Sequence, residues 1–370
     1  MTSTVSSQPP SLLLVGLDGT GPRTFLRVAR DREPSVPQPE AGDAASGHSP
    51  LAYTITTRLR SLETLVAQIG AEAPIFPDLP LQADVVVACT LSTDVGADVV
   101  VPAEARRAAL AAIVDAAAQV AAPQGRVVVM SSVRAFAASP GNQVPIPEDA
   151  PVAGADDAGF GGDVLHLERR VEALAAERPD LTITVVRPAC LVGPGIDTSM
   201  TRHFEPRRLL VIDGDEPLWQ FCHVEDLAEA VLTCIDAGLS GPVTVASPGY
   251  LTQAAVETLS GRGRFAVPEA MAMRSAFRLH RLGMLVTAGE DLAFARFPLV
   301  VSSATLNEAG WHARHDNADC VAVMLEEIRT NRMLASLRRD AVATTASAAV
   351  ALAGRAALVG IRRRHSGANR

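Results

Sequence analysis

The chain has 370 residues, 48% of them hydrophobic and 20% charged, which is ordinary for a globular protein with a sizeable core. It carries 33 basic and 41 acidic residues, and the resulting net charge of −8 argues against a nucleic-acid partner, which usually needs a basic surface. All 33 of the Lys and Arg residues are arginines. The absence of lysine excludes catalysis through a lysine Schiff base and catalysis by a Tyr-x-x-x-Lys pair.

The five cysteines lie far apart in the sequence, and their number is odd. This pattern favours reduced thiols in a cytoplasm over a disulfide framework, and it predicts no metal site. Residues 1–10 are predicted to be a disordered leader rather than a signal peptide, because no basic residue precedes the first apolar run. We therefore expect a cytoplasmic protein.

Strands and helices are predicted to alternate from residue 11 to about residue 195. The first strand is expected over 12–17, followed by a glycine-bearing turn, DGTGP, and a helix. A flexible insertion is expected over 31–50. The later strands and helices are expected at 51–57, 83–89, 103–122, 126–130, 164–177 and 181–187. Such alternation indicates βαβ units, so we predict an α/β fold with a doubly wound parallel sheet, a Rossmann-like dinucleotide-binding domain over 11–195.

The sequence after residue 195 is more mixed in pattern. Helices are expected at 225–237 and 317–330, with a strand at 242–246. We predict a smaller C-terminal α/β substrate lobe over 196–331 that is built on the same sheet.

The last segment, 332–370, differs in charge from the rest of the chain. It holds eight arginines and one acid, Asp340, so it carries about +7. A run of small and apolar residues over 341–361 is interrupted by Arg355, which opposes a membrane span. Two alternatives stay open for this basic helical or disordered tail: a helix on an anionic membrane surface, and a solvated tail.

The turn after the first strand carries the candidate cofactor-binding residues Gly16, Gly19 and Gly21. In a dinucleotide-binding fold, glycines let the backbone approach the pyrophosphate, which sits on the N-terminus of the first helix. Two registers are open: one starts at Gly16 and puts Pro22 at the third glycine position, and the other starts at Asp18. A plain strand-to-helix turn is the alternative, because it also needs glycines.

The end of the second predicted strand has no acidic residue to bind a ribose hydroxyl. It carries Arg58 and Arg60 instead. An arginine there can receive the 2′-phosphate of NADP, so the sequence favours NADP over NAD. The alternative is that both arginines are solvated residues at the start of the next helix.

Four further segments stand out in the sequence: RVVVMSSVRAF at 126–136, ITVVRPACLVGPG at 183–195, FCHVEDLA at 221–228 and SATLNEAGWHARH at 303–315. In this order they resemble motifs of the extended short-chain dehydrogenase/reductase group, the NAD-dependent epimerase/dehydratase-like proteins. The resemblance covers about residues 11–330. It implies a doubly wound sheet, bound NAD or NADP, and often a nucleotide-sugar substrate, and we take Arg187 as a further candidate cofactor-binding residue.

The resemblance also implies a catalytic tyrosine, a lysine four residues later, and a serine or threonine hydroxyl. The hydroxyl falls on Ser132. Counting back from Arg187 puts the helix glutamate of the family at Glu168, its lysine at Val164 and its tyrosine at Phe160. A phenyl ring cannot exchange a proton and an isopropyl group cannot lower the pKa of a neighbour, so the usual acid/base pair is missing.

His166 is the candidate for a replacement base, because Arg170 shares its helix face at the i, i+4 spacing. Our leading hypothesis is an NAD(P)-binding protein of this type without the standard catalysis, acting as a sensor or scaffold or running unusual redox chemistry. One alternative is an active oxidoreductase or nucleotide-sugar epimerase that uses Ser132 with water, the substrate or His166. Another is a membrane-peripheral adaptor that uses the basic tail. A small-molecule substrate is the expected partner, and a homo-oligomer is compatible with all three.

Overall fold

The computed structural model of the chain describes most of the residues from 9 to 331. The described ranges are 9–32, 53–79, 82–91, 101–153, 159–214, 216–272, 293 and 296–331. The chain divides into two compact units, Met1–Met324 and Leu325–Arg370. The described part of the second unit, residues 325–331, is helical.

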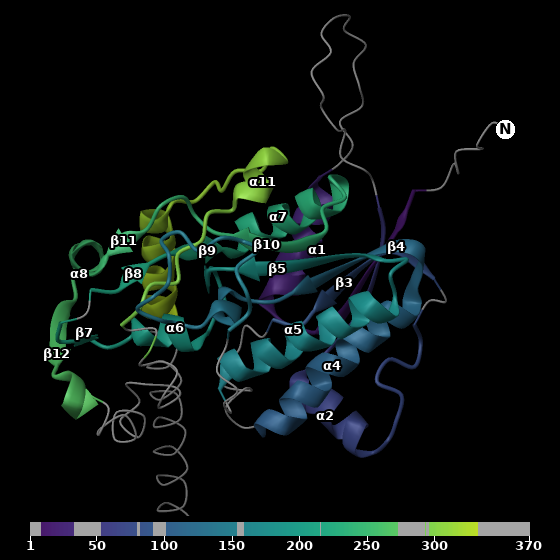
Figure 1. The fold of residues 1–370 in the computed structure, drawn as a ribbon, viewed down its shortest axis with the longest axis horizontal. Helices are drawn as coiled ribbons and strands as arrows, with labels where there is room; N and C mark the ends of the chain where they lie inside the picture. The colour runs from purple at the N-terminus through teal and green to yellow at the C-terminus, as the bar shows by residue number, and fades with distance from the viewer. Residues whose placement is uncertain are drawn as a thin grey trace, which may run out of the picture. The chain divides into compact units, whose positions relative to one another are not determined.

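The first unit is built on a parallel sheet (Figure 1). Its six strands within the described residues are β1 (Ser11–Leu17), β2 (Thr54–Arg60), β3 (Ala83–Cys89), β4 (Ala121–Met130), β5 (Thr182–Pro188) and β10 (Gly241–Val245). They lie in the order β10-β5-β4-β3-β1-β2, and every neighbouring pair is parallel. The chain passes from β1 to β2 on one side and then to β3 on the other, so the strand order reverses beside β1. The prediction of a doubly wound parallel sheet is confirmed.

Helices cover both faces of this sheet (Figure 1). One face carries α1 (Thr20–Asp31) and α7 (Val224–Asp236), and the other carries α2 (Leu62–Gly70), α4 (Ala103–Val120) and α5 (Phe160–Glu177). Strand side chains alternate between the two faces. Leu12 and Leu14 of β1 pack in one core cluster with Phe25 of α1. Leu13, which lies between them, packs in the other cluster with Ile113 of α4.

A set of short elements follows β5, and most of them lie within 196–331, the segment for which a C-terminal lobe was predicted. The elements are β6 (Cys190–Val192), α6 (Ser199–His203), β7 (Arg208–Ile212), β8 (Leu218–Trp219), β9 (Phe221–His223), β11 (Leu251–Thr252), α8 (Gln253–Ser260), β12 (Gly263–Val267) and α11 (Ala304–Glu308). The strands pair as β6 with β9, β7 with β12, and β8 with β11. Phe204, Trp219 and Phe221 pack ring against ring in the interior of this lobe.

Several predicted boundaries differ from the structure, and one helix was not predicted. The strand expected over 51–57 is β2 (Thr54–Arg60), so Arg58 and Arg60 lie inside a strand and not at the start of a helix. Helix α2 was not predicted. It begins at Leu62, directly after Ser61, which caps the helix by accepting a hydrogen bond from the Thr64 N–H. Helix α5 begins at Phe160, four residues before the predicted start. The prediction missed its first turn because Gly161 and Gly162 have a low helix propensity.

Several predictions fall outside the described residues. They concern most of the leader 1–10, nearly all of the insertion 31–50, and the whole tail 332–370. The domain boundaries at residues 195 and 331 stay predictions. Within the part of the chain that the structure describes, no helix is both long and apolar enough to cross a membrane.

Candidate functional site

The turn after β1 lies where the strand order reverses. Gly16 has φ +128°, and a Cβ at this position would stand 2.4 Å from the carbonyl oxygen of Cys89 at the end of β3. Only glycine fits this close approach of two backbones. Gly19 is the N-cap of α1, so the N-terminus of that helix lies at the carboxyl edge of the sheet. Gly21 lies in the first turn of α1.

Asp18 occupies the centre of this turn. Its N–H donates to the carbonyl oxygen of Arg60 at 2.8 Å, which ties the turn to the end of β2. Its carboxylate accepts from the Gly19 N–H at 2.8 Å and from Nη2 of Arg23 at 2.8 Å. The hydrogen bond from Arg23 is the largest effect on the pKa of Asp18, which is lowered, so the carboxylate stays ionised at neutral pH.

The segment 183–195 ends against the same turn. Oγ1 of Thr20 donates to the carbonyl oxygen of Gly195 at 2.9 Å. Gly193 has φ +149°, and a Cβ there would come within 2.5 Å of the Val224 side chain. The fold therefore brings together two segments that the sequence singled out separately.

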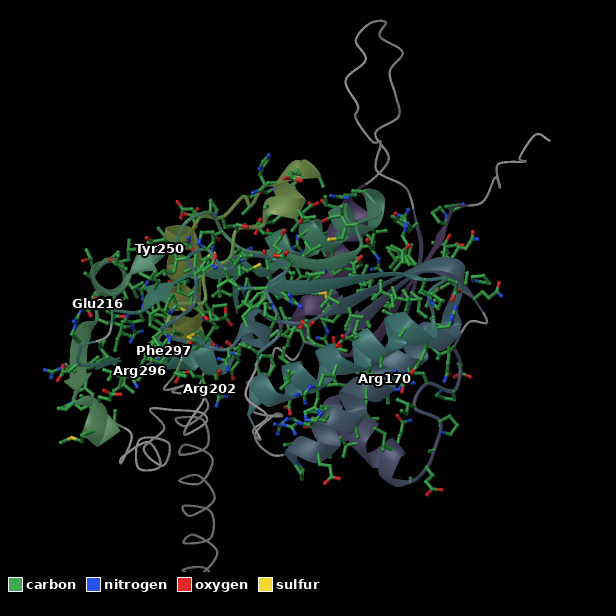
Figure 2. All side chains as sticks on the ribbon, viewed as in Figure 1. Arg170, Arg202, Glu216, Tyr250, Arg296 and Phe297 are labelled. Atoms are coloured by element: carbon green, nitrogen blue, oxygen red, sulfur yellow. The ribbon has the colours of Figure 1, made fainter. Side chains whose placement is uncertain are left out.

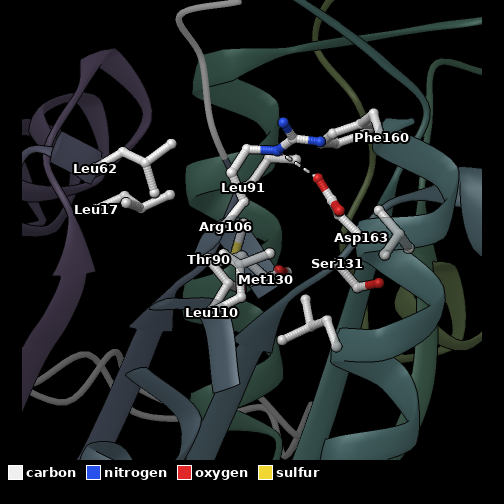
Figure 3. A pocket seen from close by; sticks show the side chains of 12 residues that line it. Leu17, Leu62, Thr90, Leu91, Arg106, Leu110, Met130, Ser131, Phe160 and Asp163 are labelled. Carbon is white, nitrogen blue, oxygen red and sulfur yellow. Dashed lines mark hydrogen bonds and ion pairs between the residues drawn. The ribbon is translucent and has the colours of Figure 1, made fainter. Parts of the chain in front are cut away.

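A pocket opens at the carboxyl ends of β1, β3 and β4, on the face that carries α4 and α5 (Figure 3). Its lining residues are Leu17, Leu62, Thr90, Leu91, Arg106, Leu110, Met130, Ser131, Phe160, Asp163, Val164 and Leu167. Phe160 and Val164 are one helical turn apart on α5 and both line it. The two positions that the resemblance assigned to a tyrosine and a lysine thus both line this pocket, and neither side chain present can move a proton.

Asp163 is the ionisable residue that sequence reasoning missed in this pocket. Nε of Arg106 donates to its carboxylate at 2.7 Å and Nε of Arg107 at 3.0 Å, both from α4. Figure 3 shows the Arg106 guanidinium pointing toward the Asp163 carboxylate. Burial raises the pKa of Asp163 against the opposing effect of the two arginines. An acid next to apolar helix positions and an adjacent pair of arginines on another helix were the available signals.

Ser132 is buried and acts as the N-cap of a short 3-10 helix, Val133–Phe136. Its Oγ accepts from the Arg134 N–H at 3.3 Å, and Ser132 is not among the pocket residues. The preceding residue, Ser131, lines the pocket, and its Oγ donates to a carboxylate oxygen of Glu168 at 2.5 Å. The structure therefore brings a serine hydroxyl to the pocket, but from the neighbouring position.

Arg187 forms the most buried ion pair of this region, with side-chain exposures of 5% for Arg187 and 7% for Glu168. Its guanidinium donates twice to Glu168, at 2.9 Å each, and once to the carbonyl oxygen of Glu148 at 3.1 Å. It also lies 4.8 Å from the ring centroid of Phe136. In this structure Arg187 joins β5 to α5 inside the core.

The suggested pair of His166 and Arg170 is not assembled at the pocket. Arg170 pairs with Asp115 of α4 at 2.6 Å and with Glu177 of its own helix at 3.0 Å (Figure 2). His166 is not among the residues that line the pocket of Figure 3. The i, i+4 spacing holds, but the face of α5 that reaches the pocket is the one with Phe160 and Val164.

Arg58 and Arg60 lie on one face of β2, because they are two residues apart on a strand. Arg60 pairs in register with Leu17, the last residue of β1, and so lies beside the glycine turn. Arg58 donates to the carbonyl oxygens of Asp78 at 2.9 Å and Thr57 at 2.8 Å. Arg60 donates to the carbonyl oxygen of Leu59 at 3.0 Å.

A second cavity lies on the opposite face of the sheet, between α1 and α7. Its lining is apolar apart from backbone: Gly21, Pro22, Phe25, Val87, Cys89, Leu91, Met130, Leu191, Val224, Leu227, Ala228 and Val231. Leu91 and Met130 line both cavities. The glycine turn therefore has a mainly apolar pocket that holds Arg106 and Asp163 on one side of the sheet, and an apolar cavity on the other.

His223, Glu225 and His315 bring metal-binding atoms within 4.8 Å of one another at the start of α7. The imidazole rings stack with centroids 3.7 Å apart. Nδ1 of His223 accepts from the Glu225 N–H at 3.3 Å and so caps α7, while the Glu225 carboxylate pairs with Arg27. Nδ1 of His223 and the Glu225 carboxylate thus already have protein partners at the start of α7.

Comparisons with known proteins agree with this geometry. Residues 73–246 match the model of the NAD dependent epimerase/dehydratase family. An uncharacterized protein of Mycobacterium tuberculosis is 31% identical over 153 residues, which are 41% of this chain and 40% of that protein. The match thus spans about two fifths of the length of this curated relative.

Two solved structures illustrate the fold. The human epimerase family protein SDR39U1, solved with NADPH, has a TM-score of 0.55 at 16% identity, over 86% of this chain and 99% of that one. UDP-glucose 4-epimerase from Bifidobacterium longum, in complex with NAD+ and UDP, has a TM-score of 0.52 at 15% identity, over 87% and 99%. The strand order and the segments gathered at the carboxyl edge agree with the match of residues 73–246 to the model of the NAD dependent epimerase/dehydratase family.

Proposed function

We propose that the chain binds a nicotinamide dinucleotide across the carboxyl edge of the sheet and does so without the tyrosine and lysine catalysis of its family. The observation that carries this is the turn at Gly16, where two backbones approach so closely that a side chain has no room. This approach places the N-terminus of α1 at the reversal point of the strand order, where ligands bind in open α/β sheets.

The residues of the turn fit a dinucleotide. Gly16 and Gly19 leave the backbone bare, and the first turn of α1 presents N–H groups of the kind that bind phosphate. The pocket beside it offers Leu17, Leu91 and Leu110 as apolar contacts for a flat ring. The human neighbour solved with NADPH and the bacterial neighbour solved with NAD+ share this fold, which supports the proposal.

NADP is the preferred form of the cofactor in this proposal. Arg60 lies at the end of β2, beside the turn, and no acidic residue of β2 takes the position that would bind a ribose 2′-hydroxyl. A guanidinium there can bind a 2′-phosphate through paired hydrogen bonds. Arg58 is already held by two backbone carbonyl groups, so we assign the larger share of the preference to Arg60.

The residues of α5 limit the proton transfer that this site can catalyse. A bound nicotinamide supplies hydride transfer, but a hydroxyl substrate also has to lose or gain a proton. Phe160 and Val164 can do neither, and the Ser131 hydroxyl is held by Glu168. The chain therefore acts as a cofactor or metabolite sensor, and a nucleotide sugar is the metabolite class that the family match and the UDP-bound neighbour support.

Titration calorimetry with NADPH, NADP⁺, NADH and NAD⁺ tests this function. We expect the NADP forms to bind more tightly, because Arg60 meets the 2′-phosphate. An Arg60→Gln variant is expected to lose the preference, by about tenfold in affinity for NADPH and little for NADH. Arg178→Gln, at the opposite edge of the sheet, is the control. The absence of binding by all four nucleotides at millimolar concentration would contradict the proposal.

Asp163 favours a second candidate function, an active oxidoreductase or epimerase with an unusual acid. It lines the pocket one residue from Val164, and its pKa is raised by burial, as is common for catalytic acids. In that case nicotinamide reduction with a panel of nucleotide sugars is measurable and falls at least a hundredfold in Asp163→Asn, while Asp115→Asn keeps its rate. If the wild-type protein binds the cofactor but shows no turnover, the second candidate function is wrong and the sensor function remains.

A further inference from the structure

The ion pair between Asp18 and Arg23 stands at the position where the proposed dinucleotide site has to receive a phosphate. Oδ1 of Asp18 accepts the Gly19 N–H at 2.8 Å, so the first backbone donor of α1 is already used. Nε and Nη2 of Arg23 bind the same carboxylate at 3.2 and 2.8 Å. An internal anion with its own counterion thus occupies the helix end.

We propose that Asp18 sets the phosphate affinity of this turn, by competing with the ligand for the Gly19 N–H and for Arg23. This inference rests on the proposed dinucleotide site. A phosphate-bearing ligand has to displace the Asp18 carboxylate, and it then takes Arg23 as its own counterion. The side chains of Asp18 and Arg23 are 38% and 72% exposed, so the pair is weak enough to exchange.

The rest of the turn stays fixed during this exchange. The backbone of Asp18 is tied to β2 through the carbonyl oxygen of Arg60, and Gly16 is held against Cys89. Only the two exposed side chains have to move. The expected consequence is a site that responds to dinucleotide or phosphate-rich metabolites at higher concentrations than a turn without the carboxylate.

Fluorescence titration of NADPH against wild type, Asp18→Asn and Asp18→Ser tests the inference. Both substitutions keep an acceptor for the Gly19 N–H and remove the charge, so we expect both to bind NADPH about tenfold more tightly. Arg23→Gln is expected to bind about tenfold more weakly. Asp180→Asn is the matched control, because Asp180 forms a similar exposed pair with Arg178 and should leave the affinity unchanged.

The outcomes separate this inference from the proposed function. If wild-type protein binds NADPH and both Asp18 variants, folded by circular dichroism, bind equally or more weakly, Asp18 does not compete with the ligand. Binding by the variants alone supports the competition. If neither the wild type nor the variants bind any dinucleotide, the proposed function itself is wrong.

Discussion

Gly16 is the single residue on which the geometry of the turn depends most. Its φ of +128° and the 2.4 Å approach to a backbone oxygen leave no room for a side chain, and a backbone neighbour cannot rotate away. We expect Gly16→Ala to lower the free energy of unfolding by about 3 kcal/mol or more, measured by urea denaturation.

Gly70→Ala provides the control for this prediction. Gly70 ends α2, and a methyl group added there would meet nothing within 4 Å, so the variant should be within about 0.5 kcal/mol of wild type or more stable. Equal stability of the two variants would show that the approach of β1 and β3 can relax. Nucleotide binding by Gly16→Ala would further contradict the assignment of the turn.

The sequence allowed family positions to be assigned to Phe160 and Val164, but it did not predict which residues surround them. Counting from Arg187 assigned the tyrosine and lysine positions to Phe160 and Val164, and the structure has both residues on α5 beside the pocket. The ion pairs of Asp163 with Arg106 and Arg107 join residues that are more than fifty positions apart. Only the packing of α4 against α5 brings them together, and no local pattern encodes that contact.

At the scale of elements, one buried ion pair joins β5 to α5 and also reaches the pocket. Glu168 binds Arg187 through both oxygens and accepts the Ser131 hydroxyl. We expect Glu168→Gln to lower the free energy of unfolding by about 3 to 5 kcal/mol, because it leaves the Arg187 charge buried without a counterion. Chemical denaturation followed by circular dichroism measures this loss.

Glu172→Gln is the control on the same helix. Its side chain is exposed, so the change in unfolding free energy should stay within about 0.5 kcal/mol. A loss of similar size in both variants would mean that charge on α5 matters in general and that the buried pair has no special weight.

The elements themselves were predictable where their patterns were long. The strands β1, β3 and β5 and the helix α4 lie close to where apolar runs and alanine-rich periodicity put them. The misses occur where a local signal was weak: α2 is short, and the start of α5 contains two glycines. Because β2 lies three residues later than predicted, Arg58 and Arg60 are strand residues, which removes the alternative that they begin a helix.

At the scale of the whole molecule, the sequence was most informative about the sheet. Alternating strands and helices predicted a doubly wound parallel arrangement, and the structure confirms it. The C-terminal lobe was predictable only as a smaller set of elements, because its strand pairs are two to five residues long and join distant segments. The basic tail 332–370 and its membrane-surface alternative stay predictions.

Leu91 and Met130 have a consequence for how the two cavities behave together. Because both residues line the pocket on one face and the apolar cavity on the other, they form a shared partition at the carboxyl edge. A ligand in one cavity that displaces these two side chains reduces the volume of the other cavity. The two cavities therefore cannot be filled independently, and an apolar ligand bound between α1 and α7 would reduce the space beside Phe160.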